Sequence, residues 1–239
     1  MMSASLQTLA PAMRDEELEA VSGRFEQAPP EAVLRWAVEE FGPDVALATG
    51  FGAEGCVLVS MLSSISPGTR VFYLDTDLLF PETYALRDQL ERRYGVRFER
   101  RASKLSLSEQ AAEHGEQLWA RRPDLCCHLR KVEPLKEMLG GLRAWVTAIR
   151  RDQSPARARV RVVERDEKFG LIKINPLAGW SSRDVWNYVA KYDVPYNPLH
   201  DHGYASIGCA PCTTPVQIGE DPRAGRWRGT QKTECGLHQ

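Results

Sequence analysis

The strongest constraint on the fold is an apolar run that passes through a glycine-rich turn into a second apolar run. Residues 44–50, DVALATG, have the length and composition of a buried strand. The turn TGFGAEG, residues 49–55, follows directly, and CVLVSMLSSI, residues 56–65, has the length of a helix closed by Pro67 and Gly68. This stretch therefore predicts a strand, a turn and a helix in that order.

The same order continues along the chain. A strand is predicted at RVFYLDT, a helix at PETYALRDQLERRYG with proline at its start and glycine at its end, and further strands at VRFER and LRAWVTAI. Alternation of this kind predicts an α/β fold with a parallel sheet flanked by helices and with ligands at the carboxyl ends of the strands. Functional residues are therefore expected just after Ala48, Leu74 and Ile149.

Three segments are expected within this architecture. Residues 1–43 form an N-terminal helical segment, which includes the amphipathic pattern EAVLRWAVEEFG, and residues 44–194 form the α/β nucleotide-binding domain. WSSRDVWNYVAKYD, near the end of that domain, is predicted to be a helix capped by serine. Residues 195–239, rich in proline, glycine and histidine, are predicted to be an irregular cysteine-bearing lobe and a mobile tail that belong to the same domain.

Composition narrows the functional class. With 43% hydrophobic residues, 26% charged residues and a net charge of −1, the chain is expected to be globular and to bind neither nucleic acid nor membrane surfaces. The N-terminus carries no apolar signal region, so a cytoplasmic location is expected. In a reducing compartment, the six cysteines favour metal or redox chemistry over structural disulfides, although Cys56, within GCVLVSML, is expected to be core.

Two turns are candidates for nucleotide binding. In TGFGAEG, the backbone N–H groups of Thr49, Gly50, Phe51 and Gly52 and the following helix end can hold a phosphate. In LDTD, Asp75 and Thr76 end the next strand and can bind a ribose or a base. Each motif by itself is equally compatible with a tight turn.

Four cysteines carry a stronger signal. Cys126 and Cys127 are adjacent, and Cys209 and Cys212 form a C-x-x-C pair. Adjacent side chains on a helix diverge by about 100°, which suits two irons of a cubane better than one tetrahedral zinc ion. We therefore favour a [4Fe–4S] cluster, with zinc and four unligated buried thiols as alternatives.

Basic residues flank these features, together with an unusual terminal thiol. Lys131, Arg150, Arg157, Arg223 and Arg226 lie near the expected ligand positions and suit an anion such as phosphate or sulfate, whereas Arg159 and Arg161 are expected to face solvent. The chain ends in KTECGLHQ, where a core role cannot explain Cys235. A charged His238 would favour a nearby thiolate, and Glu234 would oppose it.

Taken together, these motifs resemble the assimilatory adenylylsulfate (APS) reductases, within the APS/phosphoadenylylsulfate (PAPS) reductase family. The resemblance runs from about residue 44 to the end. It is carried by TGFGAEG, LDTDLLFPET, CCHLRKVEPL, RRDQSPAR, INPLAGWSSRDVW, YNPLHDHGYASIGCAPCT, GEDPRAGRW and KTECGLH. One departure is Gly50, where the family often carries serine; Thr49 is a candidate substitute.

The resemblance implies an adenine nucleotide α-hydrolase-like, Rossmann-like fold in which the glycine-rich turn and the LDT segment hold the nucleotide. It implies that Cys126, Cys127, Cys209 and Cys212 ligate the [4Fe–4S] cluster and that Cys235 is the nucleophile. It places Lys131 beside cluster and substrate and assigns Arg150, Arg157, Arg223 and Arg226 to phosphosulfate-binding stretches. His238 is expected to join the substrate site.

The expected reaction is reduction of APS to sulfite and AMP through a Cys235 S-sulfonate, with thioredoxin or a similar dithiol protein as electron donor, in sulfate assimilation. Covalent catalysis would split one difficult reduction into two steps. The alternatives are a PAPS reductase, a tRNA thiolase on a related fold, and a zinc- or cluster-binding sensor or scaffold. A homo-oligomer is possible.

Overall fold

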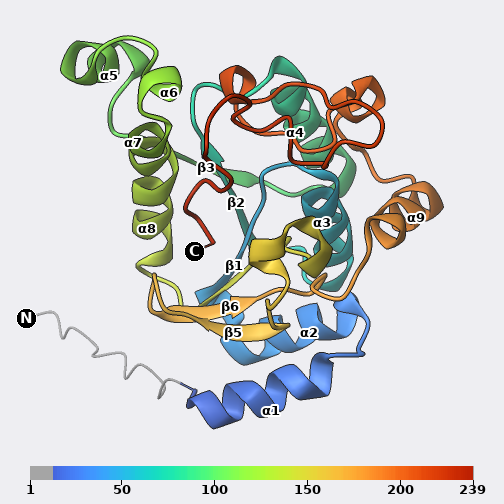
Figure 1. Cartoon of the computed structure of the whole chain (residues 1–239). Helices are drawn as coiled ribbons and strands as arrows, with labels where there is room; N and C mark the ends of the chain where they lie inside the picture. Colours follow the sequence, from blue (N-terminus) through green and yellow to red (C-terminus); the bar gives the residue numbers. More distant parts are fainter. Residues whose placement is uncertain (1–12, 239) are drawn as a thin grey trace, which may run out of the picture.

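Six strands form one sheet in the order β3-β2-β1-β4-β6-β5 in the computed structural model, which describes residues 13–238 (Figure 1). The strands are β1 (Val45–Ala48), β2 (Arg70–Asp75), β3 (Phe98–Ala102), β4 (Ala144–Val146), β5 (Val163–Asp166) and β6 (Leu171–Ile174). All neighbouring pairs are parallel except β5 with β6, which is antiparallel. The predicted parallel sheet is confirmed, with one antiparallel strand at its edge.

Helices connect and cover these strands. They are α1 (Asp15–Phe25), α2 (Pro30–Phe41), α3 (Ala53–Ile65), α4 (Pro81–Tyr94), α5 (Leu107–His114), α6 (Leu118–Arg121), α7 (Pro123–Cys127), α8 (Glu133–Leu139) and α9 (Ser182–Tyr192). Short 3₁₀ turns lie at Gly42–Asp44, Arg151–Gln153, Pro155–Arg157, Pro198–His202 and Ala210–Cys212. In the described part of the chain, none of the helices is long and apolar enough to cross a membrane.

The predicted helix ends agree with local capping chemistry. The hydroxyl of Ser181 accepts a hydrogen bond from the backbone N–H of Asp184, which is the serine cap predicted for α9. Gly95 ends α4 with a φ of 65°, a left-handed conformation in which glycine has no Cβ to strain. The strand predicted over 142–149 is shorter in the structure and spans Ala144–Val146, after which Thr147 donates its backbone N–H to Ile174 and its hydroxyl to Asn175.

Alternating strand residues face two different layers. Val45, Leu47, Val71 and Tyr73 belong to the large core under α2, α3, α4 and α9, whereas Ala46, Phe72 and Trp145 belong to a smaller cluster under α8. The N-terminal helices join the large core, and the predicted residues 1–12 of that segment lie outside the described residues. The smaller cluster also receives Leu237, so the end of the chain packs on the α8 face of the sheet.

The sheet order also fixes where a ligand can bind. β2 and β3 lie on one side of β1, and β4 and β6 lie on the other, so the chain changes direction between β1 and β4. In open α/β sheets, ligands bind outside the carboxyl ends of the strands at such a switch point. The C-terminal lobe reaches this edge through a bridge between Leu79 and Cys209.

Candidate functional site

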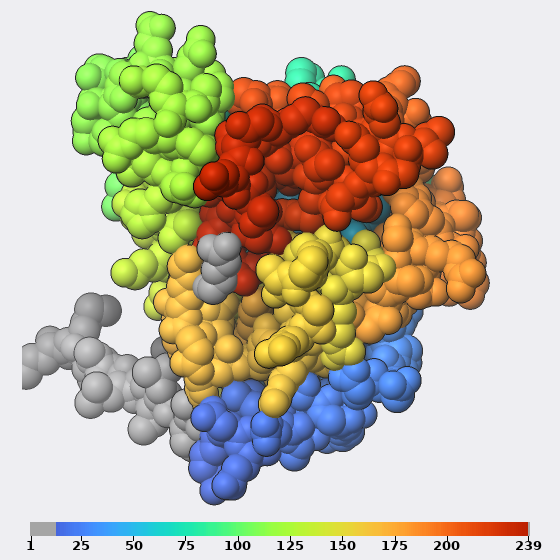
Figure 2. Space-filling model, in the orientation of Figure 1, coloured from blue at the N-terminus to red at the C-terminus, as the bar shows by residue number. Residues whose placement is uncertain are grey.

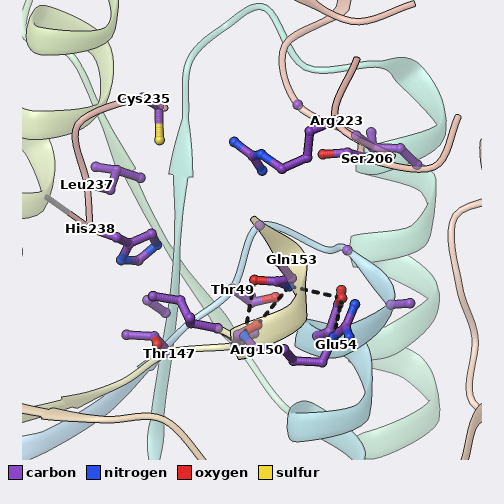
Figure 3. A pocket seen from close by; sticks show the side chains of 18 of the residues that line it. Thr49, Glu54, Thr147, Arg150, Gln153, Ser206, Arg223, Cys235, Leu237 and His238 are labelled. Atoms are coloured by element: carbon purple, nitrogen blue, oxygen red, sulfur yellow. Dashed lines mark hydrogen bonds and ion pairs between the residues drawn. The ribbon is translucent and has the colours of Figure 1, made fainter. Parts of the chain in front are cut away.

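A cavity of about 670 Å³ lies at the carboxyl ends of β1 and β4, at the switch point of the sheet. Its walls come from the glycine-rich loop, the segment after β4, the C-terminal lobe and the tail (Figure 3). Figure 2 shows the lobe, in red and orange, lying over the yellow segment near residues 150–160. Of the residues predicted to bind substrate or to react, those that line the cavity are Thr49, Gly50, Gly52, Thr76, Lys131, Arg150, Arg157, Arg223, Arg226, Cys235 and His238.

The glycine-rich loop is held in shape by Thr49. Its hydroxyl accepts a hydrogen bond from the backbone N–H of Phe51, 3.1 Å away. A Cβ on Gly55, in the first turn of α3, would lie 2.5 Å from that hydroxyl, so only glycine lets the helix approach the loop. Gly50 and Gly52 remain on the cavity wall at the start of α3, where a helix end favours a bound anion.

Phe51 and Asp75, both predicted to bind substrate, are not among the residues that line the cavity. Phe51 is buried in the core against Tyr73. The carboxylate of Asp75 accepts hydrogen bonds from Tyr84 at 2.7 Å and from Arg100 at 2.6 Å. The same carboxylate also accepts a hydrogen bond from the backbone N–H of Asp77 at 2.9 Å, so three donors of the protein hold it.

Arg150 forms salt bridges with two carboxylates of the protein. Its Nε donates to Glu54 at 2.9 Å, and it also pairs with Asp152. The side chain is only 8% exposed. Its positive charge is therefore balanced at the loop end of the cavity before any ligand is considered.

Gln153 connects Glu54 (Figure 3) to Arg157, which lies in the same segment after β4. Its side-chain amide donates to Glu54 at 3.0 Å, and its carbonyl oxygen accepts from Arg157 at 2.6 Å. A hydrogen-bonded path therefore runs from the glycine-rich loop to Arg157.

The tail enters the cavity and brings Cys235 with it. Cys235 is partly exposed, and Figure 3 shows its thiol and the guanidinium of Arg223 facing each other across the cavity. The tail backbone is held by Lys168, whose ammonium donates to the carbonyl of Gly236 at 2.5 Å. Lys232 pairs with Asp124 on α7. These contacts place the terminal thiol inside the site.

His238 lies deeper in the cavity than Cys235 and is neutral. Burial lowers its pKa well below the ordinary value of 6.5, and the nearby positive charges of Lys173 and Arg157 act in the same direction. The imidazolium considered from the sequence as support for a thiolate is therefore absent in this arrangement. The ring instead stacks on Trp145.

Two cationic side chains have fewer polar partners in the protein than Arg150. Lys131 forms no salt bridge with any of residues 13–238, and the Nε of Arg226 is buried without a hydrogen-bond partner there. Burial works to lower the pKa of Lys131, but the neighbouring sulfurs of Cys209 and Cys235 outweigh it and raise the pKa. Lys131 is therefore charged and lies where an anion can reach it.

The four cysteines predicted as ligands surround a second, small cavity next to the first. Cys126, Cys127 and Cys209 are buried and Cys212 is partly exposed, and all four are free thiols. Burial, with the neighbouring sulfurs, raises the pKa of Cys126 to about 12 and that of Cys212 to about 11. Buried thiolates need a compensating positive charge, which bound iron supplies, so the donor set fits a cysteine-ligated cluster.

Within residues 13–238, no group of three or more His, Cys, Asp or Glu side chains is arranged so that it could hold a single metal ion. The hydroxyl of Thr76 lies 3.2 Å from the sulfur of Cys209 and links the small cavity to the large one.

A π-helical turn, His128–Val132, follows Cys127 directly. Its Arg130 is 1% exposed and pairs with Asp77 at 2.9 Å, while Lys131 lines both cavities. The wider turn thus places two adjacent basic residues in different environments, and π-helical turns often occur at functional sites.

Several residues of the site were not predicted from the sequence, namely Glu54, Trp145, Asp152, Gln153, His200 and Glu234. Glu54 lies inside the motif TGFGAEG, and Asp152 and Gln153 lie inside RRDQSPAR. These three residues follow predicted strands, so their position in the sequence could have identified them as site residues. Trp145 points into the cavity from the interior of a strand, where it is indistinguishable in sequence from a core residue.

The comparisons with known proteins agree in family. Residues 44–215 match the family described as "Phosphoadenosine phosphosulfate reductase domain". The chain is 52% identical over 222 residues to the adenosine 5'-phosphosulfate reductase of Salinibacter ruber, covering 92% of this chain and 88% of that protein. It is 47% identical over 224 residues to the phosphoadenosine 5'-phosphosulfate reductase of Gloeobacter violaceus, covering 92% and 93%.

A solved structure is also similar. The phosphoadenylyl-sulfate reductase of Candida auris, a phosphate complex, superposes with a TM-score of 0.78 at 34% identity. The match covers 86% of this chain and 100% of that one. The sheet and the flanking helices are thus those of this kind of protein, an adenine nucleotide α-hydrolase-like fold.

Proposed function

The chain belongs to the phosphoadenosine phosphosulfate reductase family, and on this premise we propose that it reduces APS to sulfite and AMP in sulfate assimilation. One observation carries the proposal: the thiol of Cys235 lines the same cavity as the glycine-rich loop and the cations Lys131, Arg223 and Arg226. A nucleophile, a phosphate-binding loop and positive charges thus meet in one place. Relatives named adenosine 5'-phosphosulfate reductase, 46–52% identical, support the substrate.

The chemistry follows from these groups. The Cys235 thiolate attacks the sulfur of the sulfonyl group, an S–S bond forms, and the S–O bond to AMP breaks with its electron pair going to the phosphate. Lys131 and Arg226 stabilise the negative charge that develops on the leaving phosphate. The product of this step is a Cys235 S-sulfonate.

Release of sulfite needs a second thiol. A dithiol protein of the thioredoxin kind attacks the Cys235 sulfur, sulfite leaves with the electron pair of the S–S bond, and a mixed disulfide remains. The second thiol of the donor resolves that disulfide and restores Cys235. Two thiols thereby supply the two electrons by which the sulfate sulfur is reduced.

We further propose a [4Fe–4S] cluster on Cys126, Cys127, Cys209 and Cys212, since four thiols around one cavity fit such a cofactor. When bound, it would place its charge beside Lys131 at the cation-rich end of the large cavity. Thr76, Lys131 and Trp227 line both cavities and are the residues through which the two sites touch. Cytoplasmic location, the lack of nucleic-acid binding and homo-oligomerisation stay predictions.

PAPS is the competing substrate, because the Gloeobacter and Candida relatives are named for it. The Salinibacter relative named for APS is 52% identical to this chain, above the 47% of the Gloeobacter relative. APS is therefore the better-supported substrate.

The decisive experiment supplies APS to the purified protein with and without thioredoxin. We expect sulfite with the donor, and without it one sulfonate that maps by mass spectrometry to the C-terminal peptide. Cys235→Ser should still bind APS and form no sulfite. A normal rate of sulfite release by Cys235→Ser, or an adduct on Cys56, would refute the proposal.

A further inference from the structure

The carboxylate of Glu234, the residue before Cys235, lies between two arginines of the cavity wall. Arg157 contacts it with two nitrogens, Nη2 at 2.8 Å from Oε2 and Nε at 3.1 Å from Oε1. Arg223 adds a third contact, from Nη2 to Oε2 at 3.0 Å. The three side chains are 6%, 12% and 16% exposed for Glu234, Arg157 and Arg223 respectively, so the pairing is nearly free of solvent screening.

The same two arginines bind other atoms that fix the tail. Arg223 donates from Nη2 to the carbonyl of Thr233 at 2.9 Å, so it holds both the backbone and the side chain of the tail. Arg157 uses its remaining nitrogen, Nη1, for Gln153. Every nitrogen of the Arg157 guanidinium therefore donates to a protein acceptor.

We propose that Glu234 is a positioning residue, and that its carboxylate, held between Arg157 and Arg223, docks the tail so that Cys235 faces the cavity. This inference rests on the proposed function, in which Cys235 is the nucleophile. It assigns four of the five predicted basic residues to two tasks: Arg157 and Arg223 hold the tail, whereas Lys131 and Arg226 are left to bind the substrate anion. Arg226 fits that task because its Nε has no partner among residues 13–238.

The charges of Arg157 and Arg223 indicate that the docked position of the tail depends on Glu234. Burial lowers the pKa of Arg223, and the positive charge of Arg157 lowers it further, while Glu234 opposes both. Without the carboxylate, two buried guanidinium groups would face each other, and the tail would lose its three contacts with these arginines and a fourth from the hydroxyl of Ser154 at 3.3 Å.

A rival explanation is that Arg157 and Arg223 bind the phosphosulfate and that Glu234 only occupies their place until substrate arrives. The two explanations predict different effects of Glu234→Gln on the KM for APS. If Glu234 competes with substrate, Glu234→Gln must lower the KM for APS. If Glu234 docks the tail, the same change must slow sulfonation of Cys235 while the KM stays nearly constant.

The first measurement needs no substrate. In the full-length protein, the alkylation rate of Cys235 is followed by mass spectrometry, and we expect Glu234→Gln and Arg157→Gln each to raise it about tenfold, because a buried ion pair is broken. Glu234→Asp should recover part of the protection. Glu220→Gln, which breaks an exposed pair with Arg228 in the same lobe, is the matched control and should change nothing.

The second measurement is single-turnover sulfonation by APS. We expect Glu234→Gln to lower the rate constant about tenfold with a KM within about twofold of wild type. An unchanged alkylation rate, or a lower KM in Glu234→Gln, overturns the inference. If wild-type protein formed no S-sulfonate, the proposed function would fail, while the alkylation series would still report whether Glu234 docks the tail.

Discussion

The imidazole of His238 stacks on the indole of Trp145, with ring centroids 5.5 Å apart and planes inclined by 15°. Trp145 is a strand residue of β4 and is held by a hydrogen bond from its Nε1 to Asp166 at 3.1 Å. The last ring of the tail therefore rests on a rigid part of the sheet. An aromatic pair of this kind is worth about 0.5–1.5 kcal/mol beyond its burial, enough to influence whether the tail is docked.

Tail docking should weaken in acid because of His238. Above pH 6.5 the imidazole is neutral whether the tail is docked or free, and docking is at full strength. Below that pH the free tail binds a proton that the docked tail, whose His238 pKa is lowered, cannot accept, so docking weakens by up to about tenfold per pH unit. Hydrogen–deuterium exchange of the C-terminal peptide, corrected for intrinsic exchange rates, should show this loss.

His238→Phe is the matched control for this prediction, since it keeps a stacked ring without a titrating nitrogen. Its docking should not change between pH 7.5 and about 5.5. The same acid-induced opening in His238→Phe would show that another group is responsible.

Anaerobically purified protein should contain about four irons and four sulfides per chain, as a cysteine-ligated cubane requires. Cys209→Ser should lose most of this iron, because it removes one thiolate of four. Cys56→Ala should keep it, because Cys56 lies in the core away from the small cavity. Stoichiometric zinc without acid-labile sulfide would contradict the cluster assignment.

Gly55→Ala should weaken nucleotide binding while leaving the fold intact. The added methyl group would lie 2.5 Å from the Thr49 hydroxyl, which must then move and release the N–H of Phe51. We expect the KM for APS to rise about tenfold, which corresponds in free energy to the loss of roughly one hydrogen bond. Gly23→Ala, in α1 with open space around it, should leave the KM unchanged.

The protein should prefer APS to PAPS in kcat/KM, by about tenfold or more, because the Salinibacter relative named for APS is more similar to it, at 52% identity, than the Gloeobacter relative named for PAPS, at 47%. Competition assays with both nucleotides measure this ratio directly. A ratio of one or less would assign the protein to PAPS instead.

Local patterns predicted the fold because the features that form it are local. The helix predicted from EAVLRWAVEEFG is α2, and the apolar runs at 45–48 and 70–75 are strands, since apolar spacing within one segment decides both. The strands β5 and β6 were not predicted, because only the two end residues of β5 are buried and each strand is only four residues long.

The site was predictable as a set of residues but not as a set of contacts. The motifs suggested Thr49, Lys131 and Cys235, which line the cavity. They also suggested Phe51, whose side chain points to the core. Glu234 was considered only as a charge that opposes His238. Its pairing with Arg157 joins segments far apart in the sequence through an irregular lobe, and no periodicity in the chain encodes such a pairing.

The path from Glu54 through Gln153 and Arg157 to Glu234 has a thermodynamic consequence. Any nucleotide that changes the contacts of Glu54 changes, through Gln153, the free energy with which the tail is held. Linkage is reciprocal, so a docked tail must alter nucleotide affinity by the same factor. Departure of AMP and release of the tail that carries the modified Cys235 should therefore be coupled, whereas chemistry sets the order of the two half-reactions, because the S-sulfonate must form before a thiol can attack it.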